Sequence, residues 1–378
     1  MGKRVLSVAT LGPLDGRGVP GPLRVAALLA AEANSSGWDV RLWATTTSQR
    51  TQGSAHILGV DVQVFPARQL SRRTLGSIVS PALMVRLARS ARSYDLVHLH
   101  WGRDLVMIPA AILLRLVGVP YVTQTHGMVE PGRGVGRRLI DRLVTSPILR
   151  SAKQNFVLQE TEESWIETVT RGRARVTVVP NAGSPAVSAA VRSAPGQSLS
   201  VLFLAHLRPR KNVLMFVDAA RIICEHRADV EFVIVGPDGG DLMRLKAELE
   251  RDDCGGRLRY HGAVDAESAR LMTASADIYC LPAVNEPFPI SVLDAWSLGT
   301  PVVMTNECHI AGLAIENDTA EVCPPNPAEL AQAMERLLRS PERRRVLAEN
   351  ASGLVRGELS PASVTGDVLR AYESCMED

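Results

Sequence analysis

Two series of short apolar runs, each run followed by a helix-like pattern, succeed one another along the chain. The first series extends from Arg4 to Val179, and the second begins at Val201. Apolar runs of about four to eight residues are typical of strands buried on both faces, and their alternation with helices predicts parallel sheets. The expected strands are 4–10, 39–43, 62–64, 95–101, 121–124, 154–158, 175–179, 201–204, 230–235 and 277–281.

A stretch rich in Ala, Pro, Ser and Gly, residues 184–198, separates the two series and is typical of a linker. We therefore expect an α/β fold of two doubly wound, Rossmann-like domains that face each other across a cleft. Expected helices include one that Asp104 opens and Gly118 ends, one from Thr161, and later ones at 213–226, 327–338, 341–352 and 361–375.

The bulk composition favours a soluble globular protein. With 378 residues, 46% hydrophobic and 22% charged, the chain is long enough for two cores. The six cysteines form no Cys-x-x-Cys pair, so reduced thiols of the cytosol are expected. The apolar run 105–114 is too short to span a bilayer, and 5–9 is too short for a signal peptide.

Charge is divided unequally between the halves. Residues 1–185 hold 23 Lys and Arg against 12 Asp and Glu, a balance of +11, and the remainder holds 19 against 28, a balance of −9. Two segments, 68–92 and 133–153, interleave arginines with apolar residues. Each is either a solvated helix face with its apolar side on the sheet, or a basic amphipathic surface for anionic lipid head groups or a polyanionic acceptor.

Residues 285–303 carry the strongest candidate chemistry. Pro287 and Pro289 interrupt regular structure, which places Glu286 in a loop at the carboxyl end of a strand. Ser291 is the expected N-cap of the next helix, whose free N–H groups suit a phosphate. Taken alone, Glu286 could be a solvated loop carboxylate, and Asp294 could complete a capping box with Ser291.

This stretch resembles the signature of the family 4 glycosyltransferases, which are retaining enzymes of the GT-B fold. Their pattern is Glu, seven residues, Glu, closed by Gly-x-Pro-Val-Val, and Asp294 replaces the second Glu here. The resemblance implies that Glu286 contacts the donor sugar and Asp294 the ribose hydroxyls. It also implies that the backbone of Pro289 and Ile290, with Ser291 beside it, meets the diphosphate.

Other segments of the second half carry the same resemblance. Residues 205–212 are similar to the family's Gly-Arg-Leu-x-x-x-Lys-Gly, in which the Arg and Lys neutralise the leaving diphosphate. Lys211 matches, but His206 stands in place of the Arg, and Arg208 and Arg210 on the same loop are expected to compensate. The resemblance also assigns Gly236, Gly262 and Val264 to the donor side.

The first half supplies the acceptor side and part of the donor site. The glycine-rich turn containing Gly16, Arg17 and Gly18 resembles a family loop that faces donor phosphate and acceptor. His126 matches a histidine near the donor sugar and is, with Glu286 and Lys211, an expected catalytic residue. Its neighbours Gly127 and Met128, together with His100, are assigned to the acceptor side. His98 and His100 form a His-x-His pair without a third ligand at suitable spacing, so no metal site is expected.

The resemblance covers nearly the whole chain. It implies domains at 1–184 and 185–360, with the final helix, 361–378, completing the first. It further implies a retaining transferase that moves a sugar from a UDP- or GDP-linked donor to a hydroxyl acceptor, with no cofactor. The basic half favours a lipid-linked or polysaccharide acceptor and a cytoplasmic protein that contacts an anionic membrane, and no nucleic acid partner is expected. The alternatives are a small natural-product acceptor, a sugar-nucleotide epimerase, a phosphorylase or a catalytically weak scaffold.

Overall fold

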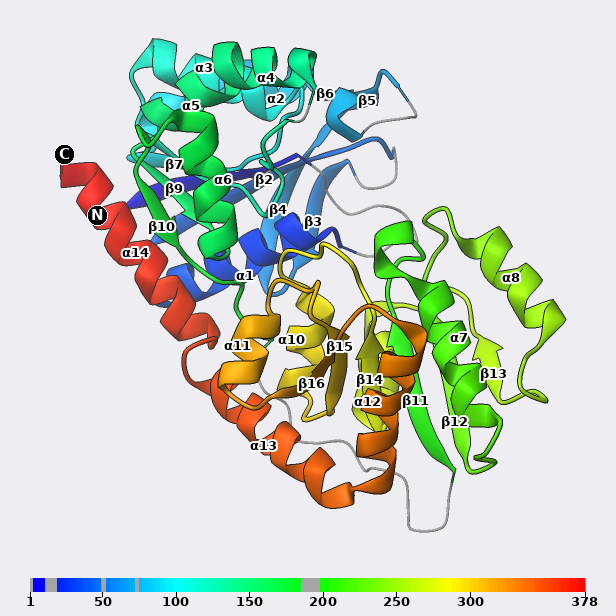
Figure 1. Ribbon diagram of the computed structural model, residues 1–378. Helices are drawn as coiled ribbons and strands as arrows, with labels where there is room; N and C mark the ends of the chain where they lie inside the picture. The colour runs from blue at the N-terminus through cyan, green and yellow to red at the C-terminus, as the bar shows by residue number, and fades with distance from the viewer. Residues whose placement is uncertain are drawn as a thin grey trace. The chain divides into compact units, whose positions relative to one another are not determined.

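The computed structural model of the protein describes residues 3–10, 19–48, 52–71, 75–132, 134–184 and 198–377. Contacts divide the chain into two compact units. Unit 1 contains residues 1–181 and 361–378, and unit 2 contains residues 182–360. Each unit is built around a sheet flanked by helices (Figure 1).

The sheet of unit 1 has eight strands in the order β10-β9-β8-β7-β1-β2-β4-β3. Its strands are β1 (Arg4–Ala9), β2 (Asp39–Thr46), β3 (Gly53–Ile57), β4 (Val60–Pro66), β7 (Leu96–His100), β8 (Tyr121–Gln124), β9 (Gln154–Val157) and β10 (Val176–Val178). Only β3 runs antiparallel to its neighbour among these described strands. The strand order reverses between β1 and β7, and ligands of open α/β sheets bind at such a switch point.

Alternate residues of β1 separate the two faces of that sheet. Leu6 and Val8 join the core beneath α2 (Pro81–Ser90) and α3 (Met107–Val117). Ser7, between them, points to the opposite face, where α1 (Gly21–Ser35) and the terminal α14 (Pro361–Glu377) pack together. The remaining helices of unit 1 are α4 (Val135–Ile140), α5 (Ser146–Ser151) and α6 (Glu160–Thr170).

The six-stranded sheet of unit 2 is parallel throughout and has the order β13-β12-β11-β14-β15-β16. Its strands are β11 (Leu199–Leu204), β12 (Val230–Val235), β13 (Leu258–Tyr260), β14 (Ile278–Leu281), β15 (Val302–Thr305) and β16 (Ala320–Cys323). Its helices are α7 (Val213–Cys224), α8 (Leu242–Arg251), α9 (Ala266–Ser275), α10 (Ile290–Ser297), α11 (Ala311–Glu316), α12 (Pro327–Arg339) and α13 (Pro341–Arg356). The order reverses between β11 and β14, which is the switch point of this unit.

Each of the ten expected strands is present, and those at 121–124 and 230–235 are confirmed to the residue. The prediction missed four strands of the two large sheets, which are β3, β13, β15 and β16. The helix expected from Asp104 begins later, at Met107. Asp104 lies outside it, and its carboxylate accepts hydrogen bonds from the amides of Val106 and Met107, each at 2.8 Å. The N-cap of α3 is Val106, so the prediction that Asp104 opens the helix is wrong.

The two arginine-rich segments have different structures. Among the described residues of the first, 68–71 and 75–92, the α-helix is Pro81–Ser90, and its apolar Leu83 and Leu87 are fully buried in the core. The second comprises α4, a π-helical turn (Asp141–Thr145) and α5. In this segment Val135, Leu139 and Leu143 remain exposed. Both segments therefore bury some apolar residues, such as Leu87 and Leu149, in the core of unit 1 and leave others, such as Val85 and Leu139, on the surface.

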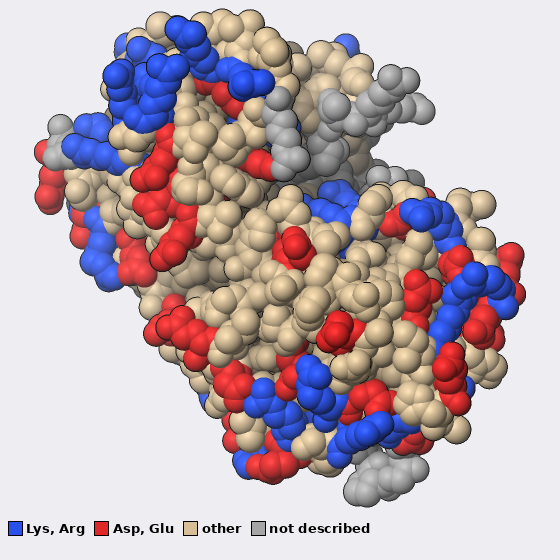
Figure 2. All heavy atoms as spheres, in the orientation of Figure 1, with Lys and Arg blue, Asp and Glu red and all other residues tan. Residues whose placement is uncertain are grey.

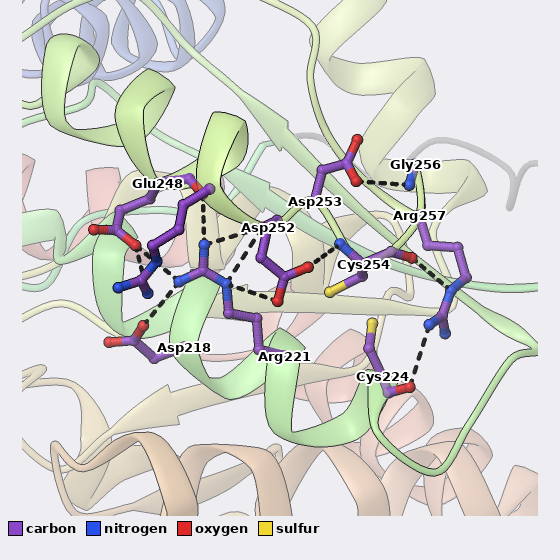
Figure 3. Close-up of polar contacts among 10 residues, drawn as sticks. Asp218, Arg221, Cys224, Glu248, Asp252, Asp253, Cys254, Gly256 and Arg257 are labelled. Carbon is purple, nitrogen blue, oxygen red and sulfur yellow. Dashed lines mark hydrogen bonds and ion pairs between the residues drawn. The ribbon is translucent and has the colours of Figure 1, made fainter.

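One polar cluster joins the ends of α7 and α8 at the edge of unit 2 (Figure 3). Arg221 bonds the Glu248 carboxylate at 2.8 Å and the Asp252 carbonyl at 2.9 Å. Arg257 donates to the carbonyls of both Cys224 and Cys254. All six cysteines are free thiols, and burial raises the pKa of Cys254 to about 12, which keeps it protonated and unreactive at neutral pH.

Helix α14 lies in unit 1, although it follows the last helix of unit 2 in sequence. Its Tyr372 hydroxyl lies 2.6 Å from Nδ1 of His98 in β7, and Lys3 pairs with Glu373. Across the described ranges, we find no helix with both the length and the apolar character needed to cross a bilayer.

Candidate functional site

The loops after β11 and β14 flank the switch point of unit 2. The first contains residues 205–212 and the second residues 282–289, and the amide of Val284 donates to the carbonyl of Arg210 at 2.7 Å. This bond brings Lys211 and Glu286, which are far apart in sequence, to one place at the carboxyl end of the sheet. The location is the one at which an open α/β sheet binds a ligand.

Glu286 lies between two cations. Its Oε1 is 2.9 Å from Lys211 Nζ, and its Oε2 is 3.1 Å from Arg210 Nε. The side chains of Glu286 and Lys211 are only 7% and 12% exposed, whereas that of Arg210 is 48% exposed. Glu286 is therefore not a solvated loop carboxylate. Burial lowers the pKa of Lys211, and the neighbouring Glu286 opposes that shift by favouring the ammonium form.

Main-chain hydrogen bonds tie the surrounding loops together. The Leu207 amide donates to the Pro237 carbonyl at 2.9 Å, and the Gly236 amide donates to the Gly262 carbonyl at 2.9 Å. On the other side, the His309 amide donates to the Glu286 carbonyl at 2.9 Å. The loops that follow five neighbouring strands are thus joined through their backbones.

Gly236 is needed for a close approach between two of these loops. Its φ is +148°, and a Cβ added there would lie 1.8 Å from the Ala205 carbonyl oxygen. Gly262 also has a positive φ, but an added Cβ would meet nothing within 4 Å. Of the two predicted donor-side glycines, Gly236 is therefore fixed by packing and Gly262 by its backbone conformation alone. Val264, four residues after β13, is exposed.

The start of α10 differs from the prediction. The helix begins at Ile290, its N-cap is Pro289, and no side chain caps it, so Ser291 is not the N-cap. The proline ring holds φ near −71°, and the chain turns into the helix directly after it. Ser291 instead hydrogen bonds to Tyr279, a buried residue of β14. The amides of Ile290 and Ser291 stand at the open end of the helix, where a phosphate oxygen would be stabilised.

Asp294 does not complete a capping box. It lies in the second turn of α10, beyond the reach of the orphan amides, and its Oδ1 accepts a hydrogen bond from Ser184 at 2.7 Å. Its expected contact with ribose hydroxyls remains a prediction. His206 and Arg208 are both exposed on the loop that leads to Lys211.

In unit 1, three histidine rings follow one another at the carboxyl ends of β7 and β8. The ring centroids of His98 and His100 are 4.4 Å apart, and those of His100 and His126 are 5.1 Å apart. His100 Nδ1 lies 2.8 Å from His126 Nε2, and Ser7 Oγ lies 3.0 Å from His100 Nε2. The predicted residues His100 and His126 are therefore in direct contact, at the switch point beside β1.

All three imidazoles are neutral at pH 7. Burial lowers the pKa of His98 and of His126 to about 3, and it lowers that of His100 well below the usual value. His126 is partly exposed and has φ +49°, followed by Gly127 at +73°, and Met128 beyond them is exposed. In the described ranges, no group of three or more His, Cys, Asp or Glu could hold a metal ion.

Glu162, which we did not predict, holds the His126 loop in place. Its Oε1 accepts hydrogen bonds from Thr125 Oγ1 and the Gly127 amide, and its Oε2 accepts one from the Leu158 amide at 2.8 Å. Burial raises the pKa of Glu162, and these three hydrogen bonds oppose the shift. The predicted Gly16, Arg17 and Gly18 lie outside the described residues.

Comparison with known families accounts for both halves of the chain. Residues 189–353 match the model of the glycosyl transferases group 1, and residues 21–182 match that of a glycosyl transferase 4-like domain. Each half of the chain is thus a domain of a glycosyltransferase family. The predicted GT-B fold is confirmed as well: this glycosyltransferase aligns with sucrose-phosphate synthase from Thermosynechococcus elongatus over 99% of both chains, with a TM-score of 0.77 at 18% identity.

Two curated relatives indicate the range of activities found among similar proteins. A phosphatidyl-myo-inositol mannosyltransferase of Mycobacterium leprae is 31% identical over 187 residues, which cover 48% of each chain. An alpha-D-kanosaminyltransferase of Streptomyces kanamyceticus is 30% identical over 172 residues, or 45% of this chain and 44% of the relative. This glycosyltransferase thus spans about half the length of the curated relatives that it matches.

Proposed function

We propose that this glycosyltransferase moves a hexosyl group from a UDP- or GDP-linked donor to a hydroxyl acceptor with retention of configuration. The observation that carries the proposal is the Lys211–Glu286–Arg210 cluster at the switch point of unit 2. Two cations around one carboxylate leave a net positive charge beside the open amides of α10. Such a site suits a diphosphate that gains negative charge as the glycosidic bond breaks.

The residues have separate roles in the proposed mechanism. Lys211 and Arg210 stabilise the diphosphate leaving group, and Glu286 contacts the donor sugar. His126 lies near the donor sugar and the acceptor, and a donor phosphate oxygen takes the proton of the acceptor hydroxyl as it attacks from the same face. The nucleotide sugar is a substrate in this scheme, and no resident cofactor is required of the protein.

Arg208→Ala and Arg210→Ala are each expected to weaken binding of UDP or GDP more than His206→Ala does. A charge-assisted hydrogen bond contributes roughly 1.5–3 kcal/mol, so each arginine should account for about 10- to 100-fold in Kd. A histidine, which lacks the guanidinium fork, contributes less. Titration calorimetry of the wild type and the three variants with each nucleotide measures the Kd values and so ranks the variants.

Two results would change the proposal. If both arginine variants keep full affinity while His206→Ala abolishes binding, the histidine itself carries the phosphate. If the wild type binds neither nucleotide and neither raises its Tm, the scaffold alternative replaces the enzyme.

For the acceptor, we propose a lipid-linked or polysaccharide intermediate presented at an anionic membrane. The exposed Val135, Leu139 and Leu143 lie four residues apart along the α4–π–α5 segment, among Arg137 and Arg142. Basic side chains gather over the end of unit 1 that holds α3 to α5 (Figures 1 and 2). An apolar stripe flanked by arginines is the surface that anionic lipid head groups attract.

Charge reversal on this segment should release the protein from membranes. We expect Arg137→Glu with Arg142→Glu to weaken binding to phosphatidylglycerol vesicles by about 2 kcal/mol or more, roughly 30-fold, because each basic residue near the surface contributes about 1 kcal/mol. Flotation at low and high salt measures the effect. The matched control reverses Arg171 and Arg173, which are exposed elsewhere in unit 1. Equal wild-type binding to neutral and anionic vesicles, or none to either, would contradict the membrane proposal.

A further inference from the structure

A small cavity lies inside unit 1, on the face of the sheet that carries Ser7 and the first histidine. The volume of this cavity is about 10 Å³, which is close to the volume that one water molecule needs. Helices α1 and α14 supply its apolar wall. Four polar side chains also line it: Ser7, His98, Thr365 and Tyr372.

Two polar atoms of this lining have no hydrogen-bond partner within the described chain. They are Nε2 of His98 and Oγ1 of Thr365, and the two residues are only 1% and 2% exposed. A buried polar atom without a partner costs roughly 1–3 kcal/mol, and ordered water commonly satisfies such atoms. Both unpaired atoms belong to side chains that line the same cavity.

The tautomer of His98 follows from its contact with Tyr372. The tyrosine hydroxyl lies 2.6 Å from His98 Nδ1, and no other acceptor for its proton is present in the part of the chain that the structure describes. Burial raises the pKa of Tyr372, so the hydroxyl keeps its proton and donates it to Nδ1. A neutral imidazole that accepts at Nδ1 carries its proton on Nε2, the unpaired atom.

We propose that the cavity binds one water molecule, and that this water completes a one-directional hydrogen-bond chain from Tyr372 to His126. The water accepts from His98 Nε2–H and from the Thr365 hydroxyl, and it donates to Ser7 Oγ. Ser7 then donates to His100 Nε2, and His100 Nδ1–H donates to His126 Nε2. His98, Ser7 and His100 each accept one hydrogen bond and donate one in this chain, and His126 is left with its proton on Nδ1.

This assignment deepens the proposed function and rests on it only for the role of His126. With Nε2 occupied by His100, His126 offers an Nδ1–H donor to an oxygen of the sugar or acceptor and does not take up a proton there. That agrees with a mechanism in which the donor phosphate accepts the proton. Ser7, His98, His100 and Tyr372 act through His126 and are positioning residues.

Long-range ¹H–¹⁵N correlation spectra of the full chain, labelled with [¹⁵N]histidine and recorded at pH 7 without nucleotide, test the chain directly. The protein has eight histidines, so single His→Gln variants can assign the signals. We expect the Nδ1–H tautomer for His126, the Nε2–H tautomer for His98, and cross-relaxation between water and the His98 Nε2 proton. An Nε2–H tautomer at His126, an Nδ1–H tautomer at His98, or a His98 ring proton without contact to water would overturn the proposal.

Two variants locate the cause. Ser7→Ala should convert His126 into a mixture of tautomers, whereas Tyr121→Phe should leave its tautomer unchanged. Tyr121→Phe also removes a buried hydroxyl in unit 1, but that hydroxyl bonds Ile148 and Ser151 rather than a histidine. An unchanged His126 in Ser7→Ala would contradict the chain. If Ser7→Ala does not fold, the wild-type tautomers still decide, and because no nucleotide is present, failure here leaves the nucleotide-binding test unaffected.

Discussion

Replacing Lys211 with methionine is expected to lower kcat of the proposed sugar transfer about 100- to 1,000-fold, or about 2.7–4 kcal/mol. Loss of one preorganised group that stabilises developing charge has this effect. The Lys211 side chain is only 12% exposed, and methionine keeps most of its apolar stem. The substitution removes the ammonium group, which lies 2.9 Å from Glu286. Initial rates at saturating nucleotide sugar measure the change.

A second variant separates lost chemistry from lost stability. Lys211→Met alone leaves the buried Glu286 with only the half-exposed Arg210 as a partner, which can cost about 3–5 kcal/mol of folding free energy. The double variant Lys211→Met, Glu286→Gln removes both charges and should recover most of that stability while staying inactive. Wild-type turnover in a folded Lys211→Met protein, or restored turnover in the double variant, would show that Lys211 does not stabilise the leaving group.

Glu162→Ala is expected to lower the free energy of unfolding by about 3 kcal/mol. The carboxylate satisfies three donors around the His126 loop, and each buried donor left unpaired costs roughly 1 kcal/mol or more. The loop also holds two consecutive residues at positive φ, a conformation that depends on such support. Urea unfolding followed by circular dichroism measures the loss.

The neighbouring helix surface provides the control for this prediction. Glu167→Ala, at an exposed position of the same helix α6, should change stability by less than about 0.5 kcal/mol. Glu162→Gln should fall between the two, because its amide can accept from one side but opposes a donor on the other. If Glu162→Ala unfolds at the same urea concentration as Glu167→Ala, the carboxylate does not support the loop.

Periodicity predicted most strands of unit 1 and three strands of unit 2, because parallel strands are buried on both faces. The runs at 121–124 and 230–235 can be assigned as strands rather than helices, because each is bounded by turn residues and is too short for a helix. The spacing of Lys211 and Glu286 in their motifs also placed them in strand-end loops, and the switch point of unit 2 brings those loops together. By contrast, the exposed edge strand β3 has no apolar run, so the hydrophobic pattern does not predict it.

Features that depend on tertiary contacts could not be predicted from the hydrophobic pattern or from local motifs. Serine is a common N-cap residue, but the N-cap of α10 is Pro289, two residues before Ser291. The Ser291 hydroxyl instead hydrogen bonds to Tyr279. Glu162 is one of four glutamates within residues 160–167, and only its orientation toward Thr125 distinguishes it. In the arginine-rich segments, the sequence does not tell the buried Leu87 and Leu149 from the exposed Val85 and Leu139, because their packing partners are distant in sequence.

The main-chain bonds between the strand-end loops of unit 2 have an evolutionary consequence. Because Leu207, Gly236 and Glu286 are held through backbone atoms, the path of these loops is largely independent of the side chains they carry. Substitutions such as histidine at 206 or aspartate at 294 can therefore accumulate without collapse of the scaffold. Side chains of these loops can therefore be exchanged while the backbone keeps its path, whereas a position that admits no side chain, such as Gly236, stays fixed.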